Sequence, residues 1–184
     1  ALLIADFYAA MMGTIPHAVD RQVVEKTQRL QGAAREAGLF VCYCATVFRP
    51  GYVEISERNK TFRERKHSGQ PAVSDPIQLI HPAVQPAAGE VVVGKHRVNA
   101  LYGTALDAIL RANDIETLII LGYATSGVVL STTRYAADLD YRLVVVEDCC
   151  ADQDPAVHDF LTQRIFPRQA DVVSAAEVME ALKA

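Results

Sequence analysis

The sequence predicts an α/β fold with three layers, in which helices cover both faces of a mainly parallel, six-stranded sheet. Short apolar runs alternate along the chain with longer stretches of helical periodicity, a pattern typical of consecutive βαβ units. The apolar runs carry Val, Ile and Leu at both odd and even positions, so each strand is expected to be covered on both faces. The length of 184 residues predicts a single domain, residues 1–184.

Six apolar runs supply the predicted strands, at residues 2–6, 39–47, 91–93, 117–122, 142–147 and 171–174. The first predicted helix carries apolar residues at helical spacing from Val19 to Ala37 and ends at Gly38. The same spacing predicts helices over 105–112 and 128–139. A helix over 155–166 begins after Asp154, which is a good N-cap, and Pro155 follows at the first helical position. A short helix over 176–182 closes the chain, so five helices are expected.

The stretch from 48 to 89 shows no clear strand. It holds many of the chain's eight prolines and a charged cluster at 57–66. A long irregular segment in a compact domain usually has a function or faces a partner. We therefore expect it to fold over the active face or to pack on a second subunit, with the charged cluster forming a solvated helix or a subunit contact.

Composition excludes several classes of function. The formal net charge is −4 and no long basic run occurs, so nucleic acid is not an expected partner. No apolar run approaches the ~20 residues that a membrane-spanning helix needs, so the protein is expected to be soluble, with no membrane partner. The four cysteines match no zinc or secreted disulfide pattern, which favours the cytoplasm. The chain begins inside an apolar run without Met, which leaves an upstream segment open and shows no targeting signal.

Polar residues that follow strands are the first candidates for chemistry, because ligands of open parallel sheets bind beyond the carboxyl ends of the strands. Asp6 ends the first predicted strand, Lys95 follows the third, and the turn 122–128 follows the fourth. A carboxylate and an ammonium in a partly dry pocket adjust each other's proton affinity, so Asp6 and Lys95 are candidates for an acid/base pair. Backbone N–H groups of the turn could bind an oxyanion, with Gly122 and Gly127 permitting close approach.

Several blocks of the sequence together resemble one known family. Residues 1–6 resemble a first strand that ends in a catalytic Asp, and 93–106 resemble a Lys block that leads into a Gly-Thr-x-Leu helix start. Residues 122–132 are similar to a third block that carries a nucleophile, and the similarity continues through 138–141 and 145–152. The family is the isochorismatase-like hydrolases, which include nicotinamidases and N-carbamoylsarcosine amidases, and the resemblance spans nearly the whole chain.

The resemblance implies catalytic roles for Asp6 and Lys95, and it places the family's nucleophilic cysteine at Val128 when counted from Gly122 and Thr125. Because valine cannot attack a carbonyl, the family's thioester route is not expected, and the chain resembles a member that lacks the nucleophilic cysteine. True isochorismatases carry glycine at that position and use the Asp as an acid on a vinyl ether. This precedent indicates that the scaffold can hydrolyse a substrate without a thiol.

Neither a metal nor another cofactor is predicted, because the nicotinamidases' Asp-x-His metal motif has no counterpart in residues 46–52. Guanidinium, phenol and amide groups near the expected pocket mouth suggest recognition of a carboxylate or a similar polar substrate. The predicted substrate-binding residues are Arg49, Tyr52 and Asn59, together with Tyr123, Ser126 and Gly127 of the turn.

Each candidate also has a simpler interpretation. Asp6 could be an ordinary strand-end carboxylate and Lys95 a solvated lysine, but the joint match favours the catalytic pair. Cys149 and Cys150 could replace the nucleophile, although small buried cysteines are more often apolar filler. Cys42 and Cys44 are expected to have structural roles. His96, beside the candidate lysine, could line the pocket, although a lone histidine is more often a packed or surface residue.

These observations predict a hydrolase that acts on a small polar or carboxylate-bearing molecule. Asp6 is the predicted general acid or base, Lys95 holds its charge, and the backbone of 126–128 binds the oxyanion. The reaction is open between vinyl-ether-type and amide hydrolysis, and the missing thiol favours the former. The alternatives are an inactive ligand-binding or scaffolding relative and a hydrolase that depends on Cys149. The resemblance also implies a homodimer or homotetramer, in which a neighbouring subunit completes the pocket.

Overall fold

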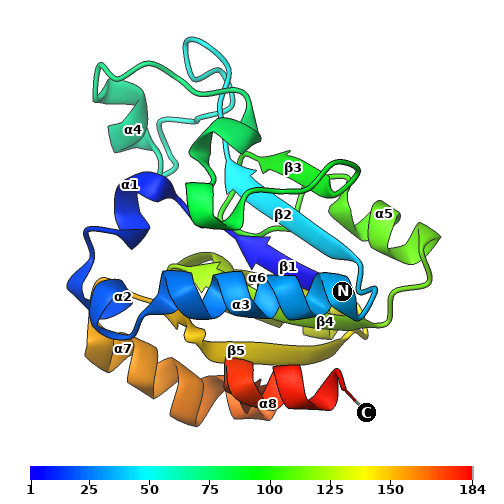
Figure 1. The fold of residues 1–184 in the computed structure, drawn as a ribbon. Coiled ribbons are helices and arrows are strands. Elements are labelled where there is room, and N and C mark those ends of the chain that lie inside the picture. The colour runs from blue at the N-terminus through cyan, green and yellow to red at the C-terminus, as the bar shows by residue number, and fades with distance from the viewer. Residues whose placement is uncertain (184) are drawn as a thin grey trace.

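The structure, a computed structural model that describes residues 1–183, has three layers with helices on both faces of one sheet (Figure 1). All strand pairs are parallel, and the strand order is β3-β2-β1-β4-β5-β6. The predicted α/β/α fold class and six-stranded sheet are confirmed. The strands are β1 (Leu2–Ala5), β2 (Val41–Thr46), β3 (Val91–Lys95), β4 (Thr117–Tyr123), β5 (Arg142–Ala151) and β6 (Asp171–Val173).

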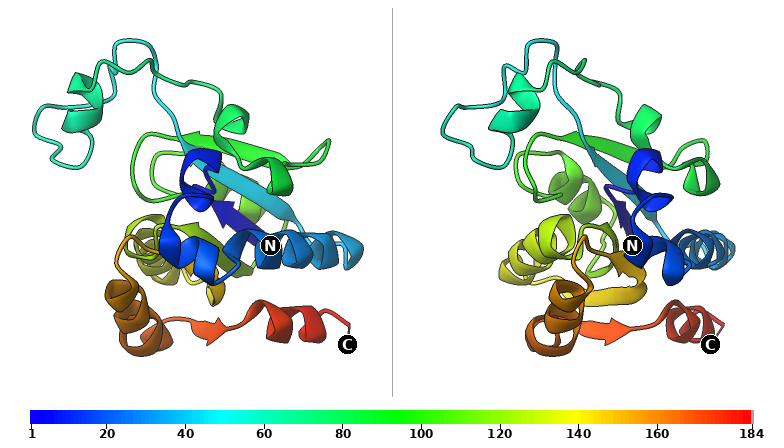
Figure 2. Two further views of the ribbon diagram at one scale, coloured as in Figure 1. Left: turned by 60° about the vertical axis from the view of Figure 1, so that its left-hand side comes forward. Right: turned by 90° about the vertical axis from the view of Figure 1, so that its left-hand side faces the viewer.

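The helices form layers on both sides of this sheet. They are α1 (Ala9–Met12), α2 (Pro16–Asp20), α3 (Val23–Glu36), α4 (Arg63–His67), α5 (Leu106–Ala112), α6 (Leu130–Asp138), α7 (Pro155–Phe160) and α8 (Ala175–Ala181). Figure 2 shows α3 and α8 on one face of the sheet and α5 and α6 on the other. Because helices cover both faces, every residue of β1 is buried, as the two-sided apolar pattern predicted.

Of the eight α-helices within residues 1–183, α1 and α2 were not predicted, and α4 was one of two alternatives for the charged cluster. The helices α1, α2 and α4 have only four or five residues, too few to show a 3.6-residue period. The predicted helix from Val19 is interrupted because Gln22 has a left-handed backbone conformation, with φ of 55°, so α2 ends at Asp20 and α3 begins at Val23. The predicted helix over 128–139 begins instead as a π-helical turn (Thr125–Val129) that continues into α6. The predicted helix over 155–166 is likewise α7 followed by a π-helical turn (Leu161–Ile165).

Strand β5 is longer than predicted. The sequence predicted an end at 147, since Glu147 and Asp148 interrupt the apolar run there. This prediction was wrong, because the strand continues to Ala151. Both carboxylates are satisfied at this point: Glu147 pairs with Arg21, and Asp148 pairs with Lys26 at 3.3 Å. Cys149 and Cys150 therefore lie within the strand and not after it.

The segment that links β2 to β3 forms a lobe beyond the end of β2, with α4 at its tip (Figure 1). The lobe has its own small core of Phe48, Tyr52 and Ile55, against which Phe62 and Ala72 pack. It also contains the 3₁₀ turns Pro76–Leu79 and Pro82–Val84. No residue of α4 is buried, so this part of the charged cluster is a solvated helix, one of the two forms expected from its composition.

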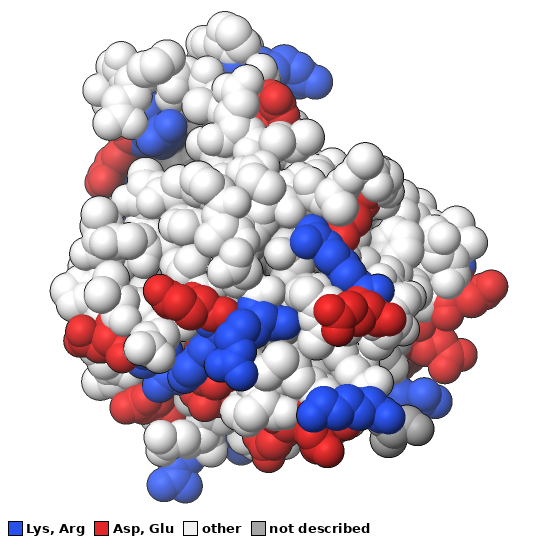
Figure 3. All heavy atoms as spheres, in the orientation of Figure 1, with Lys and Arg blue, Asp and Glu red and all other residues white. Residues whose placement is uncertain are grey.

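The surface in Figure 3 carries basic and acidic side chains that are interspersed over the lower part of this face, where α3 and α8 lie. The view shows no broad area of a single charge, in keeping with the small formal net charge of −4. Throughout residues 1–183, no helix combines the length and the apolar character that crossing a membrane requires.

Gly122 is required where β4 crosses beside β1. Its φ is +142°, and a Cβ atom there would lie 1.9 Å from the carbonyl oxygen of Ala5. Because that neighbour is backbone, Gly122→Ala is expected to destabilise the fold by more than about 4 kcal/mol, measured by urea unfolding.

Gly32→Ala is the matched control for this substitution. Gly32 lies inside α3 with no atom within 4 Å of the added Cβ, so alanine is expected to be neutral or to stabilise by about 0.5–1 kcal/mol. Equal unfolding midpoints for wild type and Gly122→Ala would show that the close approach of β4 to β1 is not a constraint.

Candidate active site

Asp6 lies at the point where β1 ends and the chain leaves the sheet. Its backbone N–H donates to the carbonyl oxygen of Cys44 on β2 at 2.9 Å, which continues the strand pairing by one bond. Its φ is 49°, in the left-handed region that Asp tolerates better than most residues. This turn directs the next residues out of the sheet and leaves the carboxyl group at the carboxyl edge, close to where the strand order changes direction between β1 and β4.

Lys95 ends β3 and reaches Asp6 across the end of β2. The distance from Lys95 Nζ to Asp6 Oδ2 is 2.7 Å, and the exposed fractions of the two side chains are 0% and 9%. The ammonium also donates to Thr46 Oγ1 at 2.6 Å and to the carbonyl oxygen of Arg97 at 3.1 Å. The expected proximity of the two side chains is confirmed, while their catalytic roles stay predictions.

Two further residues, Tyr8 and Thr46, bind the Asp6 carboxyl, and sequence reasoning missed both. The Tyr8 hydroxyl donates to Asp6 Oδ1, and the Thr46 N–H donates to the same oxygen at 3.0 Å. Thr46 could have been found, because it ends β2 and is paired in register with Lys95. Tyr8 stands two residues after Asp6, and no pattern in the sequence directs its hydroxyl back.

Burial changes the proton affinity of this cluster. Burial raises the pKa of Asp6 above its ordinary value, and the charge of Lys95 with the surrounding hydrogen bonds opposes that rise. Burial, and then the charge of Asp6, raise the pKa of Tyr8 well above its ordinary value. Asp6 therefore holds a proton more readily than an exposed aspartate, and Tyr8 stays protonated at neutral pH.

The turn after β4 is held by buried polar contacts. Thr125 Oγ1 lies 2.8 Å from His158 Nδ1, and His158 Nε2 lies 3.7 Å from Glu147 Oε2. The Ser126 N–H donates to Asp152 Oδ2 at 2.6 Å, and the Gly127 N–H donates to the carbonyl oxygen of Ala124 at 3.0 Å. Both of these amides, which the sequence offered for an oxyanion, have acceptors within the protein.

Val128 is buried in this turn with 1% of its surface exposed. It follows β4, the neighbour of β1 in the sheet, and Gly122 is paired with Ala5 next to Asp6. Val128 thus occupies the strand end beside that of Asp6. No sulfur is nearby in sequence, since the cysteines closest to it lie on β5.

All four cysteines are buried and unpaired. Burial raises the pKa of the thiols of Cys42 and Cys149 to about 12 and also raises those of Cys44 and Cys150. A thiolate is the nucleophilic form of cysteine, and burial disfavours it at each of these positions. Their predicted role as packing residues is consistent with this burial.

A cavity of about 530 Å³ lies between the lobe and the segment that follows Asp6. Tyr8 and Thr46 line it, so it reaches the two side chains that bind the Asp6 carboxyl. The remaining walls are mostly apolar, with Arg65 as the charged side chain: Ala9, Ala10, Met11, Phe48, Tyr52, Phe62, Arg65, Gln70, Val73, Gln78 and Leu79. Tyr52 is the predicted substrate-binding residue in this wall, and its hydroxyl donates to the carbonyl oxygen of Gln70 at 3.0 Å.

The other predicted binding residues lie outside this wall. Arg49 is 70% exposed and pairs with Glu54 at 2.9 Å. Asn59 accepts hydrogen bonds from backbone N–H groups at 61 and 62 and so shapes a turn of the lobe. The hydroxyl of Tyr123 lies 3.5 Å from Gln153 Oε1.

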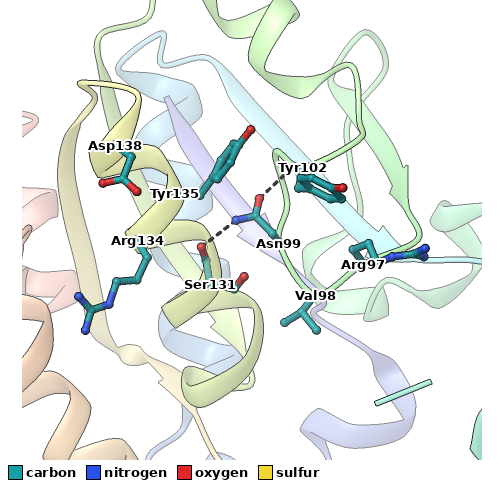
Figure 4. A pocket seen from close by; sticks show the side chains of 8 residues that line it. All are labelled: Arg97, Val98, Asn99, Tyr102, Ser131, Arg134, Tyr135 and Asp138. Carbon is teal, nitrogen blue, oxygen red and sulfur yellow. Dashed lines mark hydrogen bonds between the residues drawn. The ribbon is translucent and has the colours of Figure 1, made fainter. Parts of the chain in front are cut away.

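A second hollow lies between α6 and the segment after β3 (Figure 4). Its polar centre is Asn99, which donates to the carbonyl oxygen of Ser131 at 2.7 Å and accepts from the Tyr102 N–H at 2.8 Å. Figure 4 shows the guanidinium groups of Arg97 and Arg134 pointing away from each other. The hollow therefore does not bring the two guanidinium groups together, and it does not include Asp6 or Lys95. Within residues 1–183, no three His, Cys, Asp or Glu side chains are placed to hold a metal ion.

Known proteins resemble the chain in sequence and in fold. A family model described as the isochorismatase domain matches residues 1–177. The maleamate amidohydrolase of Pseudomonas putida is 26% identical over 87% of this chain and 74% of its own length. The N-carbamoylsarcosine amidase of an Arthrobacter species is 29% identical over 88% of this chain and 62% of its own length. The structure of an isochorismatase family protein from Burkholderia thailandensis superposes with a TM-score of 0.85 at 30% identity, covering 100% of this chain and 95% of that one.

Replacing one member of the buried ion pair is expected to lower the free energy of unfolding more than replacing both members. Asp6→Asn leaves the buried ammonium of Lys95 without an anion and is expected to destabilise the protein by about 3–5 kcal/mol. Lys95→Met leaves a carboxyl that can take up a proton, so its cost is expected to be smaller. Urea unfolding of wild type, both single variants and the double variant measures the coupling, expected at about 1–3 kcal/mol. If the free energy lost in the double variant equals the sum of the losses in the two single variants to within about 0.5 kcal/mol, the pair is not coupled.

Proposed function

Since the chain belongs to the isochorismatase family of hydrolases, we propose that it hydrolyses a small polar or carboxylate-bearing molecule with Asp6 as acid/base. Lys95 holds the charge of Asp6, and no thiol takes part. The observation that carries the proposal is the 2.7 Å contact between Lys95 Nζ and Asp6 Oδ2 at the edge of the sheet where ligands bind.

Two observations favour a reaction without a covalent thiol intermediate. The resemblance places Val128 at the family's nucleophile position, and valine carries no group that can attack a carbonyl. The four cysteines are buried with raised pKa values, so none of them supplies a thiolate at neutral pH. Water is then the nucleophile, and Asp6 is the group that moves its proton.

The wall of the cavity supports a small substrate that carries a carboxylate. Its surface is mainly apolar and aromatic, which suits the body of an organic molecule, and Arg65 supplies a guanidinium at one side. The relatives named maleamate amidohydrolase and N-carbamoylsarcosine amidase make amides the first substrates to assay. The missing thiol favours a vinyl ether of the isochorismate type.

The two reactions begin from opposite protonation states of Asp6. In amide hydrolysis the Asp6 carboxylate takes a proton from water, the water oxygen bonds to the carbonyl carbon, and the carbon–nitrogen bond breaks as the proton passes to nitrogen. In vinyl-ether hydrolysis the Asp6 carboxylic acid first protonates the double bond. Water then adds to the resulting cation and returns a proton to Asp6, before the product separates into a carbonyl compound and an alcohol.

Maleamate, N-carbamoylsarcosine and isochorismate are the substrates to assay with the purified protein. We expect hydrolysis of at least one of them, and a loss of about 10²–10⁴-fold in kcat for Asp6→Asn. Asp114→Asn is the matched control, because Asp114 is exposed and also has a left-handed backbone, with φ of 53°, so activity is expected to stay unchanged.

Treatment with iodoacetamide separates the thiol route from the water route. We expect activity to survive the reagent and to persist in Cys149→Ser. Inactivation that Cys149→Ser abolishes contradicts the proposal and favours a Cys149-dependent hydrolase. Tight binding of a substrate without turnover contradicts it in favour of a ligand-binding relative.

The dependence of kcat/KM on pH distinguishes the two reactions. The pKa of Asp6 lies above its ordinary value, about 3.9, because burial disfavours the carboxylate. A base mechanism gains activity as pH rises through this pKa, whereas an acid mechanism loses it. Lys95→Met removes a charge that lowers the pKa of Asp6, so the midpoint moves to higher pH in either case.

Lys183→Met is the control for this measurement, because the side chain of Lys183 is 71% exposed and pairs with Glu180. Its pH profile is expected to match that of the wild type. If the midpoint of the pH profile of kcat/KM does not move when Lys95 is replaced, the group that titrates in the profile is not Asp6.

A further inference from the structure

Tyr8 joins the Asp6 carboxyl to the cavity. Its hydroxyl donates to Asp6 Oδ1 and accepts the Thr46 N–H at 2.7 Å. Its backbone is fixed as well, because its N–H donates to the carbonyl oxygen of Asp6 at 2.9 Å and the residue forms an antiparallel bridge with Ile80. The phenol is therefore held in one place by contacts on both the side chain and the backbone.

Neither member of the ion pair lines the cavity. The Lys95 side chain is fully buried, and the Asp6 carboxyl sits behind Tyr8 and Thr46, which do line it. Thr46 Oγ1 accepts from Lys95 Nζ at 2.6 Å and lies 3.3 Å from Asp6 Oδ1, so its hydroxyl makes the weaker contact with the carboxyl. The Tyr8 oxygen makes the closer contact with Asp6, and Tyr8 itself lines the cavity.

We propose that Tyr8 is a catalytic residue that relays the proton between Asp6 and the reacting atoms in the cavity. The inference rests on the proposed function, since it takes Asp6 to be the acid/base. Tyr8 keeps its own proton at neutral pH, because burial and the neighbouring carboxylate raise its pKa well above the ordinary value. It therefore acts as a neutral phenol that accepts one proton while giving up another.

The relay conserves protons in both directions. In amide hydrolysis, water bonds to the carbonyl carbon and gives a proton to the Tyr8 oxygen, while Tyr8 passes its own proton to Asp6. As the carbon–nitrogen bond breaks, Asp6 returns a proton to Tyr8, and Tyr8 gives one to the leaving nitrogen. In vinyl-ether hydrolysis the proton runs first from Asp6 through Tyr8 to carbon, and the attacking water returns one by the same path. Tyr8 ends each cycle as a phenol.

Tyr8→Phe removes the relay oxygen and keeps the ring. With maleamate, N-carbamoylsarcosine and isochorismate as probes, we expect kcat to fall by about 10²–10⁴-fold with KM changed less than about threefold. We also expect the solvent deuterium isotope effect on kcat to change, because the variant lacks the proton that is transferred between the Tyr8 oxygen and Asp6. Thr46→Val is expected to lower kcat less than Tyr8→Phe does.

Tyr141→Phe is the matched control. Its hydroxyl also donates to a carboxylate, Asp107 Oδ1 at 2.8 Å, in a contact between the segment after α6 and the first turn of α5. The variant loses the same atom and the same kind of hydrogen bond, and its kcat is expected to stay within twofold of the wild type. Urea unfolding of both variants shows whether either has lost its fold.

The outcomes separate the relay from the function on which it rests. Tyr8→Phe that folds and keeps kcat within threefold, while Asp6→Asn is inactive, overturns the relay alone. If Thr46→Val lowers kcat and Tyr8→Phe leaves kcat unchanged, the relay belongs to Thr46 and not to Tyr8. An active Asp6→Asn variant, or a wild type that turns over none of the probes, overturns the proposed function and the relay together.

Discussion

The buried ion pair between Asp6 and Lys95 sets the geometry of the whole edge of the sheet. Taking an ammonium and a carboxylate out of water is costly, and the cost is met only where each charge also finds hydrogen-bonding partners. Lys95 finds Asp6, Thr46 and the carbonyl oxygen of Arg97, and Asp6 finds Lys95, Tyr8 and Thr46. The ends of β1, β2 and β3 must therefore stay in register for the pair to persist.

Much of the fold could be predicted from local pattern, because two-sided apolar runs indicate buried parallel strands and six of them occur in the chain. The departures arise where tertiary contacts override that pattern. Strand β5 passes through Glu147 and Asp148 because Arg21 and Lys26 neutralise them, and both partners lie more than a hundred residues earlier in the chain. No local pattern in the sequence carries that information.

The site was predictable to a similar extent. Asp6 and Lys95 could be paired because each follows a strand and parallel strands end at one edge. Tyr8 needed the structure, since the left-handed turn at Asp6 brings the Tyr8 hydroxyl back to the carboxyl. The cavity needed it as well, because most of its walls come from the lobe after β2, where the sequence shows no clear strand. Rigid strands thus supply the charged pair, and the irregular lobe supplies the surface that a substrate meets.

A titration of the Asp6 carboxyl by ¹³C NMR tests the central claim most directly, since it needs no substrate. The buried pair predicts that Asp6 titrates above about 3.9, the ordinary value for aspartate, and that Lys95→Met moves its pKa higher still. A carboxyl that titrates at the ordinary value, and whose pKa is the same with and without Lys95, would show that the two side chains do not share a sheltered site.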